Sequence, residues 1–143
     1  MIDVSLTQSF LTPKSVAIIG ASADPKKTGS RVQRFLVSHG YNGKIFPVNP
    51  NREEIFGLKC YPNLKSINDQ VDHIFVAVDG NKIIECIKDA ISIKVRCATI
   101  LSGGFSESGS EGNELEKYIF KIAKKGDLRI LGPNSIGFIN ISD

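Results

Sequence analysis

Short apolar runs that end at polar turns recur along this chain and alternate with segments of helical periodicity. The first run, SVAIIG at residues 15–20, follows Pro13, is rich in β-branched residues and stops at a glycine, which is typical of a strand buried on both faces. Between the second and third runs Pro62 interrupts the chain, so residues 57–61 form at most a short extra strand. The other predicted strands are at residues 44–48, 73–78, 97–101 and, more briefly, 129–131.

The segments between these strands carry apolar residues at helical spacing. The first stripe runs from Val32 to His39, and Gly40 stands where a helix commonly ends. Two longer stripes run through residues 83–91 and 115–123. Strands that alternate with helices need crossover connections, which predict a mostly parallel sheet. The expected fold class is therefore α/β: a Rossmann-like, doubly wound, mostly parallel sheet with helices on both faces.

The chain has the size of one compact domain, which we expect to span residues 1–143. No internal repeat divides it, and its longest polar stretch, residues 102–113, has the length of one functional loop. No apolar run approaches the roughly 18 residues of a membrane span, and no signal segment opens the chain, so we expect a cytoplasmic protein without a membrane partner. The net charge of +3 is too small to indicate nucleic acid.

The cysteines and histidines do not indicate a catalytic or metal site. Cys60, Cys86 and Cys97 are odd in number and form no CxxC pair, so we expect reduced core thiols. His39 ends a helical stripe and His73 enters a buried strand, so both are expected to be structural. No catalytic residue and no metal ligand is predicted.

Four loops follow predicted strands at the edge where parallel α/β sheets bind ligands. The first, residues 20–29, supplies small residues and leads into a helix, so that phosphate oxygens can approach backbone N–H groups at the positive end of the helix dipole. This loop predicts a phosphate-containing ligand, and the alternative is an ordinary polar turn. The other three loops are residues 49–51, 102–107 and 132–137.

The second strand bears on which phosphate ligand is bound. An NAD site usually has an acidic residue there to hold the ribose hydroxyls, whereas this strand ends in Val48-Asn49-Pro50. The loop also lacks the G-x-G-x-x-G pattern. Coenzyme A carries a ribose 3′-phosphate that calls for cations, and the alternative for such cations is a solvated basic face. The candidate cations are Lys26, Lys27, Arg31 and Arg52.

The two later loops have a composition suited to a reactive group. Ser102-Gly103-Gly104 and Gly132-Pro133-Asn134-Ser135 each follow an apolar strand directly. Such loops can place backbone N–H groups and one amide side chain around an acyl or phosphoryl group. The alternative is that these residues only make turns.

Four motifs occur together in a fixed order: PKSVAIIGAS at residues 13–22, FPVNP at 46–50, SGGFSE at 102–107 with Gly112 beyond it, and GPNSIG at 132–137. In this order and spacing they resemble the N-terminal CoA-binding domain of NDP-forming acyl-CoA synthetases, such as ADP-forming acetate–CoA ligase, relatives of the succinyl-CoA synthetase α subunit. The resemblance covers nearly the whole chain.

The resemblance implies that coenzyme A lies across the strand ends, with its phosphates at the Gly20 loop and its adenosine beside Asn49 and Pro50. The strand end at residues 76–78 would flank the cofactor, and its thiol end would approach the loops at residues 102 and 134. The expected CoA-binding residues are Gly20, Ala21, Ser22, Lys26, Thr28, Gly29, Arg31, Asn49, Pro50, Val76, Ala77, Val78, Ser102, Gly103, Gly104 and Asn134.

The resemblance also implies an activity and partners. In that family, acid, CoA and NTP are interconverted with acyl-CoA, NDP and phosphate through an acyl phosphate and a phosphohistidine. The histidine lies in the following domain and the nucleotide in an ATP-grasp domain. This chain would then be the N-terminal part of a larger protein, incomplete for catalysis alone, with CoA or acyl-CoA and those domains or subunits as its partners.

Two residues depart from the family pattern. Asp79 stands where relatives commonly have proline, and we expect it to cap a helix that begins at about Asn81. Ser135 stands where relatives commonly have cysteine, and no nucleophilic role is assigned to it.

Other functions remain open at this point. Similar CoA-binding domains act as regulatory modules of acyltransferases, and a free-standing CoA-binding protein is a related possibility. An NADP-binding domain is a further alternative, because the basic residues of the first loop could accept a 2′-phosphate.

Overall fold

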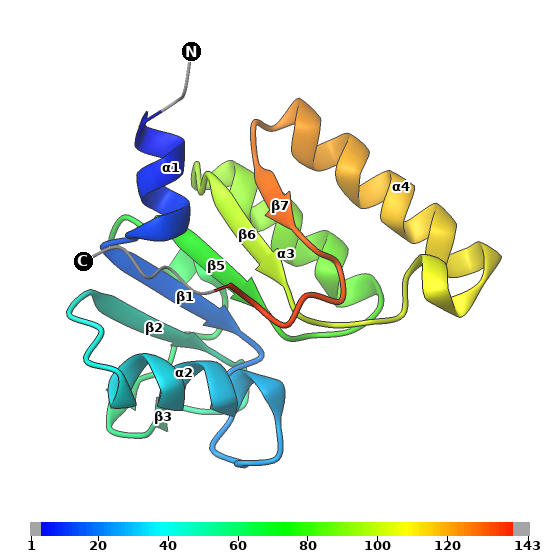
Figure 1. The fold of residues 1–143 in the computed structure, drawn as a ribbon. Helices are drawn as coiled ribbons and strands as arrows, with labels where there is room; N and C mark the ends of the chain where they lie inside the picture. Colours follow the sequence, from blue (N-terminus) through cyan, green and yellow to red (C-terminus); the bar gives the residue numbers. More distant parts are fainter. Residues whose placement is uncertain (1–3, 139–143) are drawn as a thin grey trace.

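The computed structural model describes residues 4–138 and contains a parallel sheet of five strands in the order β2-β1-β5-β6-β7 (Figure 1). Pairing between neighbouring strands is parallel throughout. The predicted fold class is confirmed, and the strands differ from their predicted bounds by no more than two residues. The strands are β1 (Ser15–Ile19), β2 (Lys44–Val48), β5 (His73–Val76), β6 (Cys97–Ile100) and β7 (Arg129–Leu131).

Helices cover both faces of the sheet (Figure 1). The three predicted stripes are confirmed as parts of α2 (Thr28–Ser38), α3 (Asn81–Ser92) and α4 (Ser110–Lys125). Between β2 and β5 lie a small antiparallel hairpin and a single 3-10 turn. The hairpin consists of β3 (Glu54–Ile55) and β4 (Leu58–Lys59), and the turns are η1 (Leu64–Ser66) and, before α4, η2 (Ser106–Ser108).

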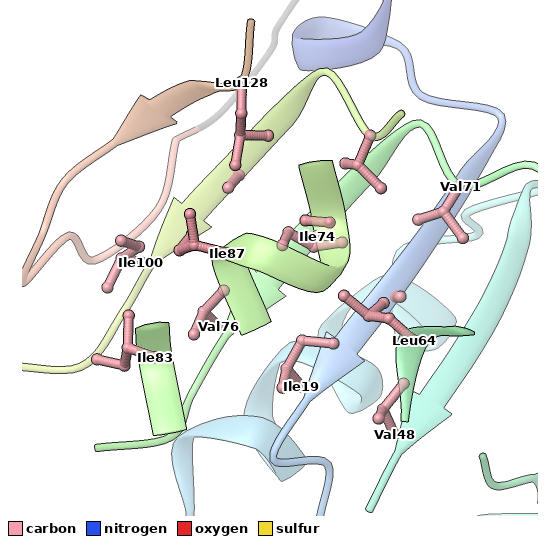
Figure 2. Close-up of a cluster of buried hydrophobic side chains, with 14 of the residues drawn as sticks. Ile19, Val48, Leu64, Val71, Ile74, Val76, Ile83, Ile87, Ile100 and Leu128 are labelled. Atoms are coloured by element: carbon pink, nitrogen blue, oxygen red, sulfur yellow. The ribbon is translucent and has the colours of Figure 1, made fainter. Parts of the chain in front are cut away.

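The larger core lies between the sheet and the helices α3 and α4. Figure 2 shows Ile83 and Ile87 of α3 beside Ile74, Val76 and Ile100 of the sheet. These five side chains have no exposed surface. Each aliphatic side chain buried in this way stabilises the fold by roughly 1.5–3 kcal/mol, so α3 is held firmly against the strands whose ends it borders.

A smaller core lies on the opposite face, under α2. Ile18 of β1 and Ile55 of the hairpin are buried there, and Val32 and Leu36 of α2 pack against them. The strand residues therefore alternate between the two cores, with Ile18 facing α2 and its neighbour Ile19 facing the larger core.

The helix α1 (Val4–Leu11) was not predicted from the sequence. Its residues interleave polar and apolar side chains without a helical stripe, and it is held by tertiary contacts at the amino ends of β5 and β6. The ring of Phe10 lies edge-on to His73 with centroids 5.1 Å apart, and the Cys97 thiol donates to the carbonyl of Leu6. Local sequence alone carries little of this information.

One expectation about a helix start is wrong. The N-cap of α3 is Gly80, at φ 60°, and no side chain caps the helix, so Asp79 does not cap it. The polar stretch 102–113 contains η2 and the first residues of α4. Gly112 stands in the first turn of α4 although glycine disfavours helices, because a Cβ atom there would lie 1.9 Å from the carbonyl oxygen of Phe105.

No helix within residues 4–138 is both long enough and apolar enough to cross a membrane.

The first turn of α2 lies very close to the turn after β1. A Cβ atom on Gly29 would lie 2.1 Å from the carbonyl oxygen of Gly20, and Gly29 itself is buried. Only a residue without a side chain allows the helix to approach this closely.

We therefore predict that Gly29→Ala lowers the free energy of unfolding by about 2–3 kcal/mol, because a backbone atom cannot move aside as a flexible side chain can. Urea unfolding followed by circular dichroism measures this. Thr28→Ala, at an exposed position in the same turn, is the control and should change stability by less than about 0.5 kcal/mol. Equal losses in the two variants would contradict the prediction.

His73 is buried in the sheet and bonded at both ring nitrogens. Nδ1 lies 3.2 Å from the carbonyl oxygen of Ser9 and donates to it, and Nε2, 2.8 Å from the Thr99 hydroxyl, accepts from it. Burial lowers the pKa of His73 from 6.5 to about 4, against a smaller opposing effect of the Ser9 carbonyl. The expectation that His73 is structural agrees with this geometry.

A stability loss in acid follows from this pKa. Between pH 6.5 and 4 the unfolded chain binds a proton at His73 that the folded chain does not, so stability falls as the pH falls through this window. We expect a contribution of about 3 kcal/mol at pH 4 relative to pH 7. Urea titrations at both pH values measure the loss in free energy of unfolding between pH 7 and pH 4. This loss should be smaller in His73→Gln than in the unmodified chain by about the contribution of His73. An identical loss in the two proteins would refute the assignment.

Candidate functional site

A cleft of about 540 Å³ opens at the carboxyl ends of β1, β2 and β5. This is the edge at which the sequence predicts a ligand. Seven of the predicted site residues line the cleft: Gly20, Ala21, Ser22, Asn49, Pro50, Ala77 and Val78.

The turn after β1 uses some of its amides within the protein. The N–H groups of Gly20 and Ala21 both donate to the carbonyl of Val48, at 3.1 and 3.2 Å. These two amides of the loop are therefore engaged and not available to a phosphate. Gly20 is needed for another reason: at φ 84° a Cβ atom would lie 2.6 Å from the carbonyl oxygen of Ala77.

Other amides of the same turn remain free. Within residues 4–138, no acceptor is bonded to the N–H groups of Ser22, Ala23, Thr28 or Gly29. Thr28 and Gly29 open α2, whose N-cap, Lys27, provides no side-chain acceptor. Unpaired N–H groups and the helix dipole together make such a helix start attractive to an anion.

Asn49 ties the ends of β1 and β2 together. Its Nδ2 donates to the carbonyl of Ala21 at 2.9 Å, and its Oδ1 accepts from the amide of Asn51 at 2.9 Å. The side chain that stands where an NAD site has its acidic residue is thus engaged in holding the turn. Its role is to shape the cleft wall.

The charges of the cleft are divided between its walls. Lys27, from the start of α2, lies on one side. The wall formed by α3 is mainly acidic, although Lys82 belongs to it and Asp89 is paired with Lys65 at 2.6 Å. The charged residues contributed by α3 and the loop before it are Asp79, Lys82, Glu85 and Asp89.

The pKa of the Cys86 thiol reflects both its burial and the acidic residues near it. Cys86 is half-buried in the α3 wall, and burial together with Asp89 and Glu85 raises the pKa of its thiol to about 11. The remaining cysteines, Cys60 and Cys97, are buried, and all three are free thiols as predicted. A negative charge is therefore disfavoured beside this part of α3.

Several predicted residues lie near the cleft without lining it. Lys26 and Arg31 are exposed on either side of Lys27 and the helix start, and Arg52 follows the β2 turn. Val76 has no exposed surface and belongs to the core. Of the four cations proposed from the sequence, Lys27 alone belongs to the lining.

The two later loops form one cluster beside the cleft. The hydroxyl of Ser102 donates to the carbonyl of Val78 at 2.6 Å, and Val78 lines the cleft. The amide of Asn134 donates to the carbonyl of Ser102 at 3.0 Å, and Gly103 lies between them and Glu107. The predicted loops at residues 102 and 134 are thus brought together.

Glu107 fixes the shape of this cluster. Its carboxylate accepts from the amide of Gly104 at 2.8 Å. Bonds from the amides of Glu107 itself, Gly104 and Phe105 lower the pKa of this carboxyl group. A carboxylate held in this way acts as a loop anchor.

Sequence reasoning missed the α3 wall. Lys82, Glu85, Cys86 and Asp89 are spaced i, i+3, i+4 and i+7, so they share one helix face next to the apolar stripe. That spacing was visible in the sequence and could have identified the wall. The segment of Pro62, Asn63 and Leu64, which also lines the cleft, gave no comparable signal.

Comparison with protein families gives one matching model, described as a CoA binding domain, over residues 14–141. Acetate–CoA ligase (ADP-forming) II of Archaeoglobus fulgidus is 44% identical over 128 residues, which are 90% of this chain and 19% of the relative. The α subunit of acetate–CoA ligase (ADP-forming) II of Pyrococcus furiosus is 37% identical over 131 residues, 92% of this chain and 28% of the subunit.

Solved structures of similar proteins also match this chain in fold and in sequence. Acetyl-coenzyme A synthetase 1 of Ca. Korarchaeum cryptofilum, in complex with phosphate and ADP, matches with a TM-score of 0.84 and 39% identity over 90% of this chain and 27% of that chain. A hypothetical protein from Pyrococcus horikoshii matches with a TM-score of 0.72 and 25% identity, over 92% of this chain and 84% of that one.

The chain thus spans between about a fifth and three-tenths of the ligase relatives it matches. The resemblance drawn from the four motifs is confirmed, since the relatives are ADP-forming acid–CoA ligases and their subunits. Because the family model covers nearly all of its length, the chain belongs to the CoA-binding domain family.

Proposed function

We propose that this chain binds coenzyme A in the cleft and serves as the CoA-binding part of an ADP-forming acid–CoA ligase. The observation that carries the proposal is the uncapped start of α2, with Lys27 beside it, at the mouth of a cleft in a chain of the CoA-binding domain family. The cytoplasm is the compartment we expect, because the three cysteines are free thiols.

The phosphates would lie at the start of α2. The free amides of Ser22, Ala23, Thr28 and Gly29 can donate to phosphate oxygens, and the ammonium group of Lys27 supplies a positive charge. The donor set therefore fits an anionic group without any rearrangement of the bonds that Gly20 and Ala21 make.

The end of β2 argues against NAD. Asn49 offers no carboxylate to ribose hydroxyls, and its amide group is already bonded to the backbone at Ala21 and Asn51. Asn49 and Pro50 would instead border the adenosine of CoA as parts of the cleft wall.

The thiol end of CoA would lie past Val78, near the cluster of the two later loops. This cluster consists of Ser102, Gly103, Gly104 and Asn134. Bound CoA supplies a thiol that accepts and carries an acyl group. Neither histidine lines the cleft, and Glu107 is occupied by backbone amides, so nothing in this cluster offers a free base. As the resemblance to ADP-forming acid–CoA ligases implies, a phosphohistidine domain and an ATP-grasp domain, or subunits, would complete the reaction.

Isothermal titration of the chain with CoA tests the proposal. We expect saturable binding with a Kd below about 1 mM, that is, at least about 4 kcal/mol. Folded protein that gives no heat at millimolar CoA would reject it. Competition with NADP separates the alternative: NADP that binds more tightly and is not displaced by CoA would show a nucleotide-binding domain of another class.

Lys27→Ala should weaken CoA binding about tenfold, because one charge-assisted contact at the helix start is lost. Lys121→Ala, the control, removes an exposed lysine of α4 outside the cleft lining and should weaken it by less than about twofold. If Lys27 meets the diphosphate, dephospho-CoA loses as much affinity as CoA. Similar effects of the two single variants would contradict the placement.

The 3′-phosphate assignment of Lys26 and Arg31 is tested by the double variant. Replacing both should weaken CoA more than dephospho-CoA if they meet that phosphate. Equal losses of affinity for CoA and dephospho-CoA would show that they meet the diphosphate, or act only through the general positive field of the basic turn.

A free-standing CoA-binding protein is the second candidate, favoured by the match to most of the P. horikoshii hypothetical protein. The reading frame downstream of this chain separates the possibilities. A phosphohistidine and ATP-grasp region downstream would support the ligase, and an acetyltransferase region would support a regulatory module. The absence of both regions would support the free-standing protein.

A further inference from the structure

The outer side of α2 and the tip of the β3–β4 hairpin, which lie next to each other in Figure 1, carry an apolar patch. Phe35 and Val37 of α2 are 56% and 61% exposed, and Phe56 at the hairpin tip is 49% exposed. These three residues line one groove of about 380 Å³, which shares no residue with the cleft. The rest of its lining is Gln33, Arg34 and Ser38. Exposed apolar side chains that gather in one place, unlike single ones, mark an interaction surface.

Phe56 has a backbone conformation that an aromatic residue disfavours. Together with Gly57 it forms the two-residue turn between β3 and β4, and the two residues have φ values of 51° and 76°. A turn with two positive φ angles favours asparagine followed by glycine, because few other residues tolerate this conformation. Since half of the Phe56 side chain is exposed, packing within this chain does not account for the aromatic residue. A strained, exposed residue of this kind points to a functional contact.

A buried hydrogen bond fixes the hairpin beside α2. The Nε2 of Gln33 donates to the carbonyl of Ile55 at 3.0 Å, and both residues are buried. The side chain of Ile55 also belongs to the core under α2, where Val32 and Leu36 pack against it. Phe56, the next residue, is thereby held in place, so the groove is already formed before a partner binds.

Arg34 is the charged residue of the groove lining. It makes no salt bridge in the part of the chain that the structure describes. Its helix contains a second arginine, Arg31, and no acidic residue. The acidic residues closest in sequence to the hairpin tip, Glu53 and Glu54, do not line the groove, and Glu54 lies opposite Lys59 in the hairpin register. An unpaired guanidinium group beside apolar surface is complementary to an apolar segment that carries a carboxylate.

Building on the proposed function, we propose that this groove is the docking site for an apolar, carboxylate-bearing segment from a part of the ligase outside this chain. The chain covers 19% and 28% of two ligase relatives, so most of such a protein is available to supply the segment. A second copy of this chain fits less well, because it would bring Arg31 and Arg34 against the same arginines. The segment would cover Phe35, Val37 and Phe56, and its carboxylate would pair with Arg34.

The test measures how fast a thiol in the groove reacts with a maleimide. Val37→Cys places a thiol there, and the chain's own cysteines are buried or half-buried. In the isolated chain this thiol should react quickly at low and at high protein concentration. In the protein made from the full reading frame, assembled with its second subunit where it has one, the rate should fall at least about tenfold, because the docked segment covers the thiol. Peptide mass spectrometry measures the label at this position alone.

Two further variants test the chemistry of the contact in the full protein. Arg34→Glu, combined with Val37→Cys, should raise the labelling rate about fivefold, because it places a like charge against the carboxylate. Phe56→Asn should raise the rate as well. In the isolated chain, Phe56→Asn should keep or increase the urea midpoint, because asparagine is favoured in this turn. Lys121→Cys, at an exposed position of α4, is the control and should react equally fast in both proteins.

An unchanged rate at Val37→Cys in the full protein overturns the inference, and so does an equal slowing at Lys121→Cys. Slow labelling of the concentrated isolated chain would assign the groove to a second copy and overturns it too. A rate that Arg34→Glu leaves unchanged overturns the pairing with a carboxylate, and a protein without any further domain or subunit has no such segment. None of these measurements uses CoA, so the titration with CoA tests the proposed function separately.

Discussion

The carbonyl group of Val48 is the anchor on which the cleft depends. It accepts the amides of both Gly20 and Ala21, so the chain leaving β1 is bound to the end of β2 before it turns toward α2. The Asn49 side chain repeats the connection through the carbonyl of Ala21. With both strand ends joined, Gly29 can bring α2 against the Gly20 carbonyl, and the helix start is held at the mouth of the cleft.

This anchoring changes how a glycine loop attracts an anion. The Gly20 amide donates to Val48, and the missing side chain of Gly20 allows the close approach of Ala77 after β5. The donors left for a ligand come from Ser22 and Ala23 and from the first turn of α2. The wall formed by α3 and the loop before it carries charges of both signs, since Lys82 stands among Asp79, Glu85 and Asp89.

The order of strands and helices could be predicted from the sequence, because buried strands and amphipathic helices leave different periodicities. The loops that meet at the cleft followed from that order, since the carboxyl ends of parallel strands share one edge of the sheet. What could not be predicted depends on tertiary contact. The helix α1 is held by its contacts with His73 and Cys97, and the direction of the Gly20 amide depends on Val48, 28 residues away in a neighbouring strand.

Nor could the sequence separate the cations of the basic turn from one another. Lys26, Lys27 and Arg31 are equivalent by composition, and only the geometry of the turn separates Lys27 from the other two. The cap of α3 was mispredicted, because Gly80 takes a positive φ at the position where sequence rules expect a side-chain cap. The α3 wall was overlooked although its i, i+3, i+4, i+7 spacing was readable.

Cys86 carries a last consequence for a cleft that we propose receives a thiol cofactor. Disulfide exchange requires the attacking sulfur to be ionised. Burial, together with Asp89 and Glu85, raises the pKa of the Cys86 thiol to about 11, so the thiolate is disfavoured at neutral pH. The protein's own sulfur is thereby kept chemically quiet, and oxidised forms of the cofactor could pass through the cleft without becoming covalently trapped there.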